Sequence, residues 1–309
     1  MTAQSYQPLT TSVIIPVLND IESLESCLEA LAHQTYDSTQ YEIIVVDNGS
    51  EEIASIQSLI KKYSQAKLVQ ELTPGSYAAR NKGISIAQGE IIAFTDADCI
   101  PAPNWLEKGV QFLLENPKCG LVGGQIKMQL ANPEDPNMVE LYESVRALPQ
   151  QEFIEKDHFA ATANLFTNRA TITQIGTFNS ELKSSGDVEW GRRVHAHGLQ
   201  LKYNSEALIF HPTHSSFNDF FIRTRRLAGG HYDLRMRQAK SNWQRRINVI
   251  KLLIYNLIPP VFFAIHTLLN PEITGIDKKL KISWMMWIVR YISFVEILRL
   301  QFGKTSIRI

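Results

Sequence analysis

Residues 90–98 read Glu-Ile-Ile-Ala-Phe-Thr-Asp-Ala-Asp, a short apolar run that ends in two aspartates. Because no polar residue interrupts positions 91–94, the run is typical of a strand buried on both faces of a sheet. Similar runs occupy Ser12–Pro16 and Tyr41–Val46 earlier in the chain. Strands of this kind need helices on both sides, so these runs predict a layered α/β fold.

The segments between these runs have helical periodicity. Apolar residues recur every three or four positions in 21–33 and 51–62, and 76–88 reads as a helix that ends at Gly89. Strands that alternate with helices predict a mostly parallel sheet flanked by helices. The remaining predicted elements are strands at Lys67–Gln70 and Leu121–Met128, and helices at 103–114 and 187–197.

Length and composition exclude several classes of protein. The chain has 309 residues, of which 44% are hydrophobic and 20% charged, so it can bury a core and is not globally disordered. Its three cysteines, Cys27, Cys99 and Cys119, fit no zinc site or disulfide framework, which indicates a reducing compartment. Residues 1–11 lack the basic start and apolar stretch of a secretory signal. We therefore expect the body of the protein in the cytosol.

Charge is distributed unevenly, although the formal net charge is zero. Residues 1–200 carry 14 basic and 25 acidic side chains, whereas residues 201–309 carry 17 basic and 6 acidic ones. An acidic body with a basic tail predicts that the tail faces an anionic partner, either a membrane surface or a nucleic acid. No aromatic-plus-basic module accompanies the charges, so we expect no nucleic-acid partner.

The sequence changes character near residue 240, which predicts a globular domain over 1–240 and a helical segment over 241–309. The basic stretch 217–246, expected to be helical, precedes Leu252–Leu269, which contains no Asp, Glu, Lys or Arg. Ile282–Leu298 is again apolar, with a narrow polar stripe and tryptophans that suit a membrane interface.

We expect residues 245–302 to attach the protein to the cytoplasmic face of a membrane. Leu252–Leu269 just reaches the length of a spanning helix, but Pro259 and Pro260 would kink it. A spanning hairpin and helices lying in the interface both remain open. The alternative is a soluble pair of helices packed on the body.

Polar residues follow three of the predicted strands. Asn19 comes after the first strand, Asp47 after the second, and Asp96 after the strand at 91–95. The carboxyl ends of parallel strands share one edge of a sheet, where ligands bind. Each polar group alone could instead form a turn or cap a helix. The convergence of three such groups favours a binding site.

Asp96 and Asp98 are the most informative pair. Alternate residues of an extended segment point the same way, so the two carboxylates would raise each other's pKa unless a positive charge intervened. A divalent cation with oxygen ligands, completed by phosphate oxygens, would relieve the repulsion. The alternative is that Asp98 caps the next helix while Asp96 is solvated.

The segment Pro74–Gly83 is a glycine-containing loop that leads into a helix. It offers backbone N–H groups, Arg80 and Lys82 to an anion. It is not a Walker A loop, because the Gly-Lys-Ser/Thr ending is absent. An exposed first helical turn with solvated cations explains the same residues equally well.

Taken together and in this order, these residues resemble glycosyltransferase family 2, whose members adopt the Rossmann-like GT-A fold. The similarity covers roughly residues 10–215. The matching residues are Val13-Ile14-Ile15-Pro16, Asn19, Val45-Val46-Asp47-Asn48-Gly49-Ser50, Gly75, Ala79-Arg80-Asn81, Gly83, Gly89-Glu90, Thr95-Asp96-Ala97-Asp98, Asn164, Gly176, Phe178, Ser185-Gly186-Asp187, Glu189-Trp190 and Arg193.

The resemblance implies an enzyme that moves a sugar from a nucleotide-sugar, with a UDP-sugar as the first candidate, to a lipid-linked or glycan acceptor. Asp96 and Asp98 would hold Mn²⁺ or Mg²⁺ against the diphosphate. His211 matches a position that often contacts the metal or diphosphate in this fold class, with His214 as its competitor. The residues implied in nucleotide-sugar binding are Pro16, Asn19, Asp47, Gly75, Arg80, Asn81 and Asp96.

Asp187 would be the catalytic base by the same resemblance. A carboxylate near the acceptor hydroxyl can take its proton as the oxygen attacks the anomeric carbon, and a single base implies inversion. Its position in the first turn of a helix favours the ionised form, although it could serve only to complement the helix dipole. The family usually has an adjacent Glu-Asp pair here, whereas this chain has Gly186-Asp187, which leaves Glu189 as a rival base. Trp190 fits core packing better than sugar stacking.

Two other functions compete with a glycosyltransferase. A phosphotransferase or phosphatase could use Asp96 as nucleophile and Asp98 as acid, although such sites usually have Gly-Thr after the pair and this chain has Cys99-Ile100. A non-catalytic membrane adaptor could retain a transferase-like body. The complete set of acidic residues argues against the adaptor.

Overall fold

A computed structural model describes residues 11–146 and 148–308, so residues 1–10, which carry most of the prediction about a signal sequence, lie outside it. The described chain divides into two compact units. The first unit runs to Lys127 and adds Pro149–Ser180 and Gly186–His211, while the second consists of Met128–Leu148, Glu181–Ser185 and Pro212–Ile309. The boundary predicted at residue 240 falls inside the second unit.

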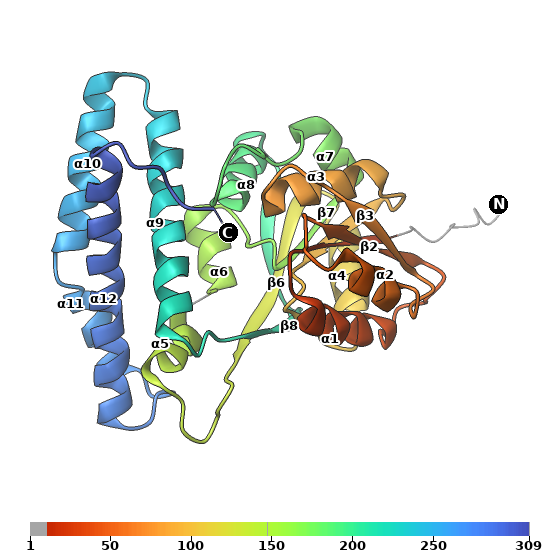
Figure 1. Cartoon of the computed structure of the whole chain (residues 1–309), viewed down its shortest axis with the longest axis horizontal. Helices are drawn as coiled ribbons and strands as arrows, with labels where there is room; N and C mark the ends of the chain where they lie inside the picture. Colours follow the sequence, from red (N-terminus) through yellow and green to blue (C-terminus); the bar gives the residue numbers. More distant parts are fainter. Residues whose placement is uncertain (1–10, 147, 309) are drawn as a thin grey trace. The chain divides into compact units, whose positions relative to one another are not determined.

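The sheet has the strand order β3-β2-β1-β4-β7-β6-β8-β5 (Figure 1). Strands β1 to β4 run parallel to one another, as predicted, but β7 is antiparallel to both β4 and β6, and β5 is antiparallel to β8. The sheet is therefore mixed rather than mostly parallel. Strand bounds are β1 Thr11–Val17, β2 Tyr41–Asp47, β3 Ala66–Gln70, β4 Ile91–Thr95, β5 Ile100–Pro101, β6 Cys119–Gln129, β7 Asn164–Asn168 and β8 Gln200–Pro212.

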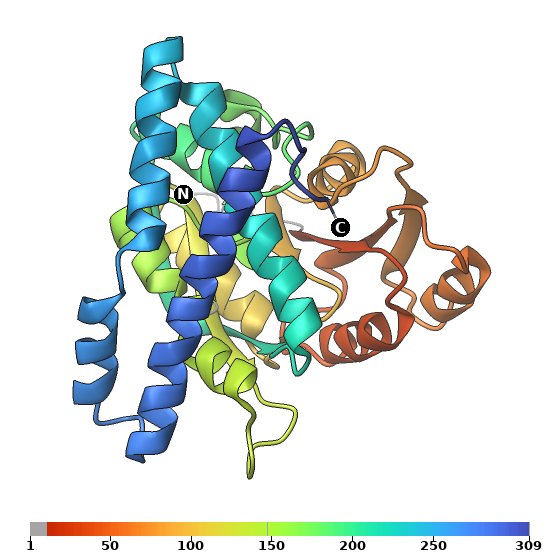
Figure 2. The ribbon, with the colours of Figure 1, turned by 60° about the vertical axis from the view of Figure 1, so that its left-hand side comes forward.

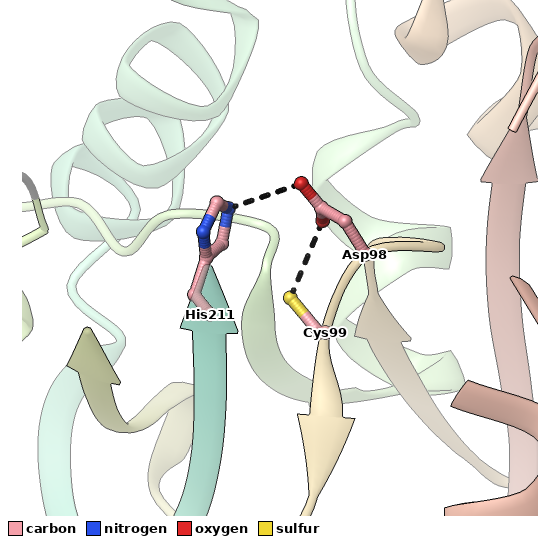
Figure 3. A group of neighbouring side chains, drawn as sticks. All are labelled: Asp98, Cys99 and His211. Carbon is pink, nitrogen blue, oxygen red and sulfur yellow. Dashed lines mark hydrogen bonds and ion pairs between the residues drawn. The ribbon is translucent and has the colours of Figure 1, made fainter. Parts of the chain in front are cut away.

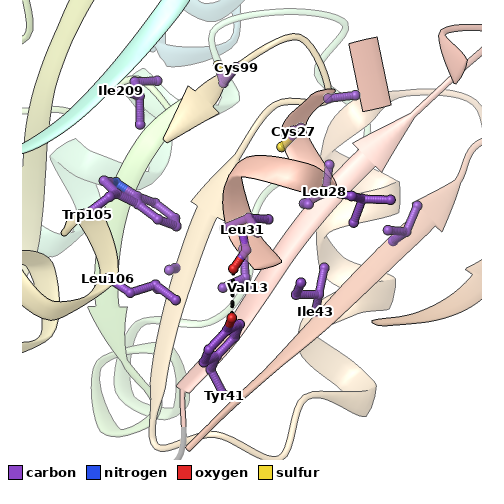
Figure 4. Packing of buried hydrophobic residues seen from close by; sticks show 14 of the residues in the cluster. Val13, Cys27, Leu28, Leu31, Tyr41, Ile43, Cys99, Trp105, Leu106 and Ile209 are labelled. Atoms are coloured by element: carbon purple, nitrogen blue, oxygen red, sulfur yellow. Dashed lines mark hydrogen bonds between the residues drawn. The ribbon is translucent and has the colours of Figure 1, made fainter. Parts of the chain in front are cut away.

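Helices cover both faces of this sheet, because its strands are apolar on both sides. Val13 and Ile15 of β1 pack into one cluster with Leu28, whereas Ile14 between them belongs to a second cluster. Figure 4 shows part of the first cluster, in which the Tyr41 hydroxyl donates to the Leu31 carbonyl at 2.7 Å. The helices of this unit are α1 Ile21–Ala32, α2 Ile53–Ile60, α3 Ser76–Ile86, α4 Trp105–Glu115, α6 Gln150–Glu152, the π-helix η1 Phe153–Asp157, α7 Arg169–Ile175 and α8 Gly186–Ala196.

The second unit is a helical bundle (Figure 2). Tyr142 packs with Phe220, Ile282 and Met285 in its apolar core. The stretch 217–246 is helical, as expected, and consists of two helices. The chain leaves the first at Ala239 and starts the second after Ser241, whose hydroxyl accepts from the Gln244 N–H. The helices are α5 Met138–Arg146, α9 Phe217–Gln238, α10 Asn242–Leu257, α11 Val261–Leu269 and α12 Ile276–Gln301.

The polar stripe predicted on the last helix makes contacts within the bundle. Glu296 is almost fully buried and pairs with Arg225 of α9 and with Arg299. Arg290 donates to the carbonyls of Tyr255 and Ile258, where α10 ends before the two prolines. Among residues 11–146 and 148–308 no single helix has both the length and the hydropathy of a membrane span. The pair α10 and α11 has both, with a 43° bend between them.

Candidate active site

Strands β2, β1 and β4 are neighbours in the sheet, so the polar residues that follow them meet at one edge, as predicted. Asn19, after β1, has a left-handed backbone with φ of 53° and holds the turn after β2. Its backbone N–H donates to the Ser50 hydroxyl at 2.8 Å, and its side-chain oxygen accepts from the Glu51 N–H at 2.9 Å. The ends of β1 and β2 are therefore fixed to each other.

Asp47 is fully buried at the end of β2. Its carboxylate accepts the backbone N–H groups of Gly49 and Ser50, at 3.3 and 3.0 Å, and a longer bond from Gln70. The next residue, Asn48, accepts from the Gly75 N–H at 2.6 Å and so fixes the loop that begins α3. Gly75 has a φ of 123°, a conformation that favours glycine.

Arg80 lies on α3 and is 3% exposed. Its guanidinium forms an ion pair with the carboxylate of Asp96, whose side chain is still partly exposed. The sequence left open an anionic ligand or solvent as the partner of Arg80. The structure gives the guanidinium an internal partner, Asp96, and its role in nucleotide-sugar binding stays a prediction. Its Nε is buried and has no hydrogen-bond partner within the described chain, so one donor is left over.

Asp98 and His211 come together from distant parts of the chain (Figure 3). The Nε2 atom of His211, near the end of β8, is 3.6 Å from Oδ2 of Asp98. Burial raises the pKa of Asp98; the proximity of His211 opposes this, while Asp96 and Asp20 add to it. Asp98 does not cap the next helix, since α4 begins after Asn104.

Cys99 completes a group of three side chains whose ligand atoms all lie within 4.8 Å of one another. Burial raises the pKa of the Cys99 thiol well above its usual range, and sulfur is a softer ligand than Mn²⁺ or Mg²⁺ prefers. The donor set that remains is a carboxylate and an imidazole, with Asp96 two residues from Asp98. Carboxylate oxygens are ligands that Mn²⁺ and Mg²⁺ prefer, and the imidazole adds a nitrogen donor, which is more typical of a transition metal.

Asp187 lies in the first turn of α8, where the Tyr77 hydroxyl donates to its Oδ1 atom at 3.1 Å. The same oxygen accepts the Val188 N–H at 2.9 Å. Burial raises the pKa of Asp187, and the Val188 N–H, the Arg80 guanidinium and the Tyr77 hydroxyl oppose that rise. Arg80 therefore acts electrostatically on Asp187 while it pairs with Asp96.

The rival base is engaged elsewhere. Glu189 forms an ion pair with Arg193 one turn later on α8, with Nε and Oε1 2.7 Å apart. Arg193 in turn donates to the carbonyls of Ile175 and Thr177, which joins the last turn of α8 to the end of α7. This arrangement favours Asp187 as the residue able to accept a proton.

Several predicted site residues have structural contacts. Both ends of the Asn81 amide are used by the backbone of Phe178, at 2.8 and 3.0 Å. Trp190 is buried and donates to the Gly176 carbonyl, as expected for core packing. Pro16 is half-buried in β1 and lies in register with Val46. The roles assigned to them in donor binding stay predictions.

Tyr77 is the site residue that the sequence reasoning missed. It lies inside the loop-to-helix segment that was singled out for anion binding, and nothing in its spacing connects it to a residue more than one hundred positions away. The sequence did hold one sign of it: Gly186 stands where the family usually has a glutamate. The missing side chain leaves room beside Asp187 for another group, such as the tyrosine ring.

The fold and the arrangement of acidic residues are those of the GT-A type. Acidic residues lie at or just after the ends of the parallel strands β2 and β4, and helix α8 of the same unit carries a further carboxylate, Asp187. The chain belongs to glycosyl transferase family 2, whose family model matches residues 12–175. The chain is 37% identical over 206 residues to the glycosyltransferase AglE of Haloferax volcanii, a match that covers 65% of this chain and 66% of AglE.

Solved structures show the same fold. The mannosyltransferase PcManGT from Pyrobaculum calidifontis, in complex with GDP-Man and Mn²⁺, matches with a TM-score of 0.63 and 18% identity, over 95% of this chain and 88% of its own. Residues 1–349 of S. aureus TarS, in complex with UDP, match with a TM-score of 0.52 and 18% identity, over 96% of this chain and 92% of theirs.

Proposed function

We propose that this protein is an inverting, metal-dependent glycosyltransferase that moves a sugar from a nucleoside diphosphate donor to a hydroxyl of a lipid-linked or glycan acceptor. The observation that carries the proposal is the approach of His211 to Asp98 at 3.6 Å, next to the Asp96–Arg80 pair. PcManGT with GDP-Man and Mn²⁺, and TarS with UDP, support a nucleotide-bound donor.

The residues divide the work of the reaction between them. Asp98, Asp96 and His211 would hold the divalent cation, whose contribution is Lewis-acid stabilisation of charge on the departing diphosphate. Asp187 would take the proton from the acceptor hydroxyl as that oxygen attacks the anomeric carbon. Because one base serves one displacement, the configuration at that carbon inverts.

A transfer assay with Mn²⁺ and a panel of nucleotide-sugars tests the proposal. Asp98→Asn and Asp187→Asn should each lower the transfer rate by about a hundredfold or more, the order expected when one preorganised electrostatic group is lost. Asp157→Asn is the matched control, because Asp157 is exposed in the same unit. If both site variants transferred sugar at the wild-type rate, the roles assigned to Asp98 and Asp187 would be refuted.

We also propose that the helical unit attaches the protein to the cytoplasmic face of a membrane. Within the described residues, all but five of the exposed large apolar side chains lie at or beyond Trp243, on or between α10, α11 and α12 or just after α12. Phe262 is 90% exposed. Arg245, Arg246 and Lys251 are exposed on α10 and could meet anionic headgroups. Apolar and basic side chains side by side are typical of interfacial helices.

Cosedimentation with vesicles of phosphatidylglycerol and phosphatidylcholine tests this attachment. Phe262→Asp should lower the bound fraction, because a charge replaces an apolar side chain where the vesicle would touch. Leu72→Asp is the control, since Leu72 is 76% exposed but lies in the other unit. Equal binding of the two variants, or a wild type that stays in the supernatant, would exclude the proposed attachment.

A further inference from the structure

The ring of Tyr77 occupies the space next to Gly186. A Cβ atom built on Gly186 would lie 2.7 Å from Cε2 of Tyr77 and 2.8 Å from two more ring atoms, closer than real Cβ contacts. The ring has little freedom to retreat, because it is 8% exposed and packs on Phe178 with ring centroids 5.8 Å apart. The ring of Tyr77 can therefore occupy this position only if residue 186 has no side chain.

The hydroxyl of Tyr77 reaches the start of α8 from this position. It donates to Oδ1 of Asp187 at 3.1 Å. A buried hydroxyl requires a partner, and here the partner is the carboxylate assigned as base rather than a carbonyl of the core.

The two hydrogen bonds on Asp187 fall on one oxygen. Tyr77 and the Val188 N–H both donate to Oδ1, and in the part of the chain that the structure describes no hydrogen bond reaches Oδ2. The carboxylate plane is therefore fixed, and Oδ2 is the atom left to accept a proton. The bond from Tyr77 also favours the charged form of the carboxylate, since it is donated to an anion.

Tyr77 is close both to Asp187 and to the ion pair of Arg80 and Asp96. The Arg80 guanidinium carbon is 5.8 Å from the Tyr77 ring centroid, and the same guanidinium pairs with Asp96. Arg80 on α3 is a charged side chain that acts on Asp187, and the ion pair of Glu189 and Arg193 lies further along the same helix as Asp187. Tyr77 is thus in contact both with the base and with the side chain that neutralises Asp96.

We propose that Tyr77 is a positioning residue for Asp187, and that Gly186 is present so that the tyrosine can reach it. This inference rests on the proposed function. In the displacement, the acceptor oxygen forms a bond to the anomeric carbon, the bond from that carbon to the diphosphate oxygen breaks, and its electron pair leaves with the nucleoside diphosphate. The proton of the acceptor hydroxyl goes to Oδ2 of Asp187, which Tyr77 keeps oriented through Oδ1.

The test is Tyr77→Phe, which removes the hydroxyl and keeps the ring. We expect kcat to fall about tenfold to a hundredfold, as for loss of a hydrogen bond to a charged group, with the donor KM unchanged. The acid limb of the kcat–pH profile should move to higher pH, because an anion that loses a donor binds its proton more tightly. Tyr41→Phe is the matched control, since its buried hydroxyl donates to the Leu31 carbonyl and accepts from the Gln65 amide, and neither residue belongs to the candidate site; it should leave kcat and the pH profile unchanged.

A second pair of variants examines the glycine. Gly186→Ala should lower kcat at least as much as Tyr77→Phe, because the new methyl group displaces the ring. In an enzyme that already carries Tyr77→Ala, Gly186→Ala should lower kcat only a little further. The two positions should therefore be coupled in a double-mutant cycle. Full additivity would overturn the requirement for glycine.

An infrared titration of the carboxylate band, taken as the difference between wild type and Asp187→Asn, measures the proton affinity of Asp187 without any donor. Tyr77→Phe should raise the pKa obtained in this way. An unchanged pKa, or an active enzyme whose kcat and pH profile survive Tyr77→Phe, would overturn the inference. Absence of transfer by the wild type would count against the proposed function alone, because the titration does not depend on it.

Discussion

Replacing Asn164 with leucine should destabilise the protein by about 3 kcal/mol or more, at about 1 kcal/mol or more for each of three lost hydrogen bonds. Asn164 is fully buried on β7. Its Oδ1 atom accepts from the Trp105 indole at 2.9 Å, and its amide donates to the carbonyls of Gln125 and Ala207 at 2.9 and 2.8 Å. Leucine has the same branched arrangement of side-chain heavy atoms, but it would leave one donor and two acceptors unpaired in the core.

Asn168→Ala is the matched comparison for this prediction. Asn168 lies at the other end of β7 and makes one capping bond, from the Thr171 N–H to its Oδ1 at 2.7 Å. Loss of such a cap costs about 1 kcal/mol. Urea unfolding followed by tryptophan fluorescence, with circular dichroism as a second probe, would give both free energies of unfolding.

The site supplies a second readout for Asn164→Leu. Asn164 lies in register with Thr95, the residue before Asp96, and bonds the strand that continues to His211. Mn²⁺ should therefore bind more weakly to Asn164→Leu than to Asn168→Ala. If the leucine variant lost no more stability than the alanine variant, the reasoning that counts unpaired groups would be wrong.

Three further outcomes are expected. The transfer rate should rise with pH through an apparent pKa above the usual aspartate value of about 3.9, because burial raises the pKa of Asp187 and the base must be ionised; a pH–rate profile measures this. Burial works against the charge on Glu143, but hydrogen bonding from His214 and the nearby charge of Arg223 outweigh it and lower the pKa of Glu143. Glu143→Gln should therefore cost about 3 kcal/mol near pH 7, and the difference should shrink as the pH falls through that lowered pKa, which denaturant unfolding at several pH values would show. Gly109→Ala should destabilise by roughly 1 to 3 kcal/mol despite its better helix propensity, since the added Cβ would lie 2.1 Å from the ring of Phe166; the thermal midpoint checks this.

The fold of the first strands could be predicted because local sequence determines it. Residues 91–95 form β4 as expected, since a continuous apolar run can be buried on both faces only in the middle of a sheet. β7 was not predicted, because only Leu165 and Phe166 are apolar within it and its antiparallel insertion depends on pairing with β4, more than seventy residues earlier. The mixed character of the sheet follows from that strand and from the antiparallel pair of β5 and β8.

The position of the candidate site could be predicted from the sequence, but the contacts within it could not. Asn19, Asp47 and Asp96 converge because they end neighbouring parallel strands, which is a property of the topology. The partner of each side chain was not predictable, because it depends on long-range placement. The pairing of Arg80 with Asp96, sixteen residues later in the chain, is an example. The role of Arg80 toward an anionic ligand stays a prediction.

The division of the chain into two units has a consequence for how such proteins can be cut and recombined. The polypeptide crosses between the units five times, and Gly186 and His211 each stand directly at a crossing. A fragment that ended at residue 240 would leave α5 without α12, and Tyr142 without Ile282 and Met285. The helical part therefore cannot be exchanged between relatives as one continuous cassette, and any chimera would need junctions immediately beside the base and the histidine.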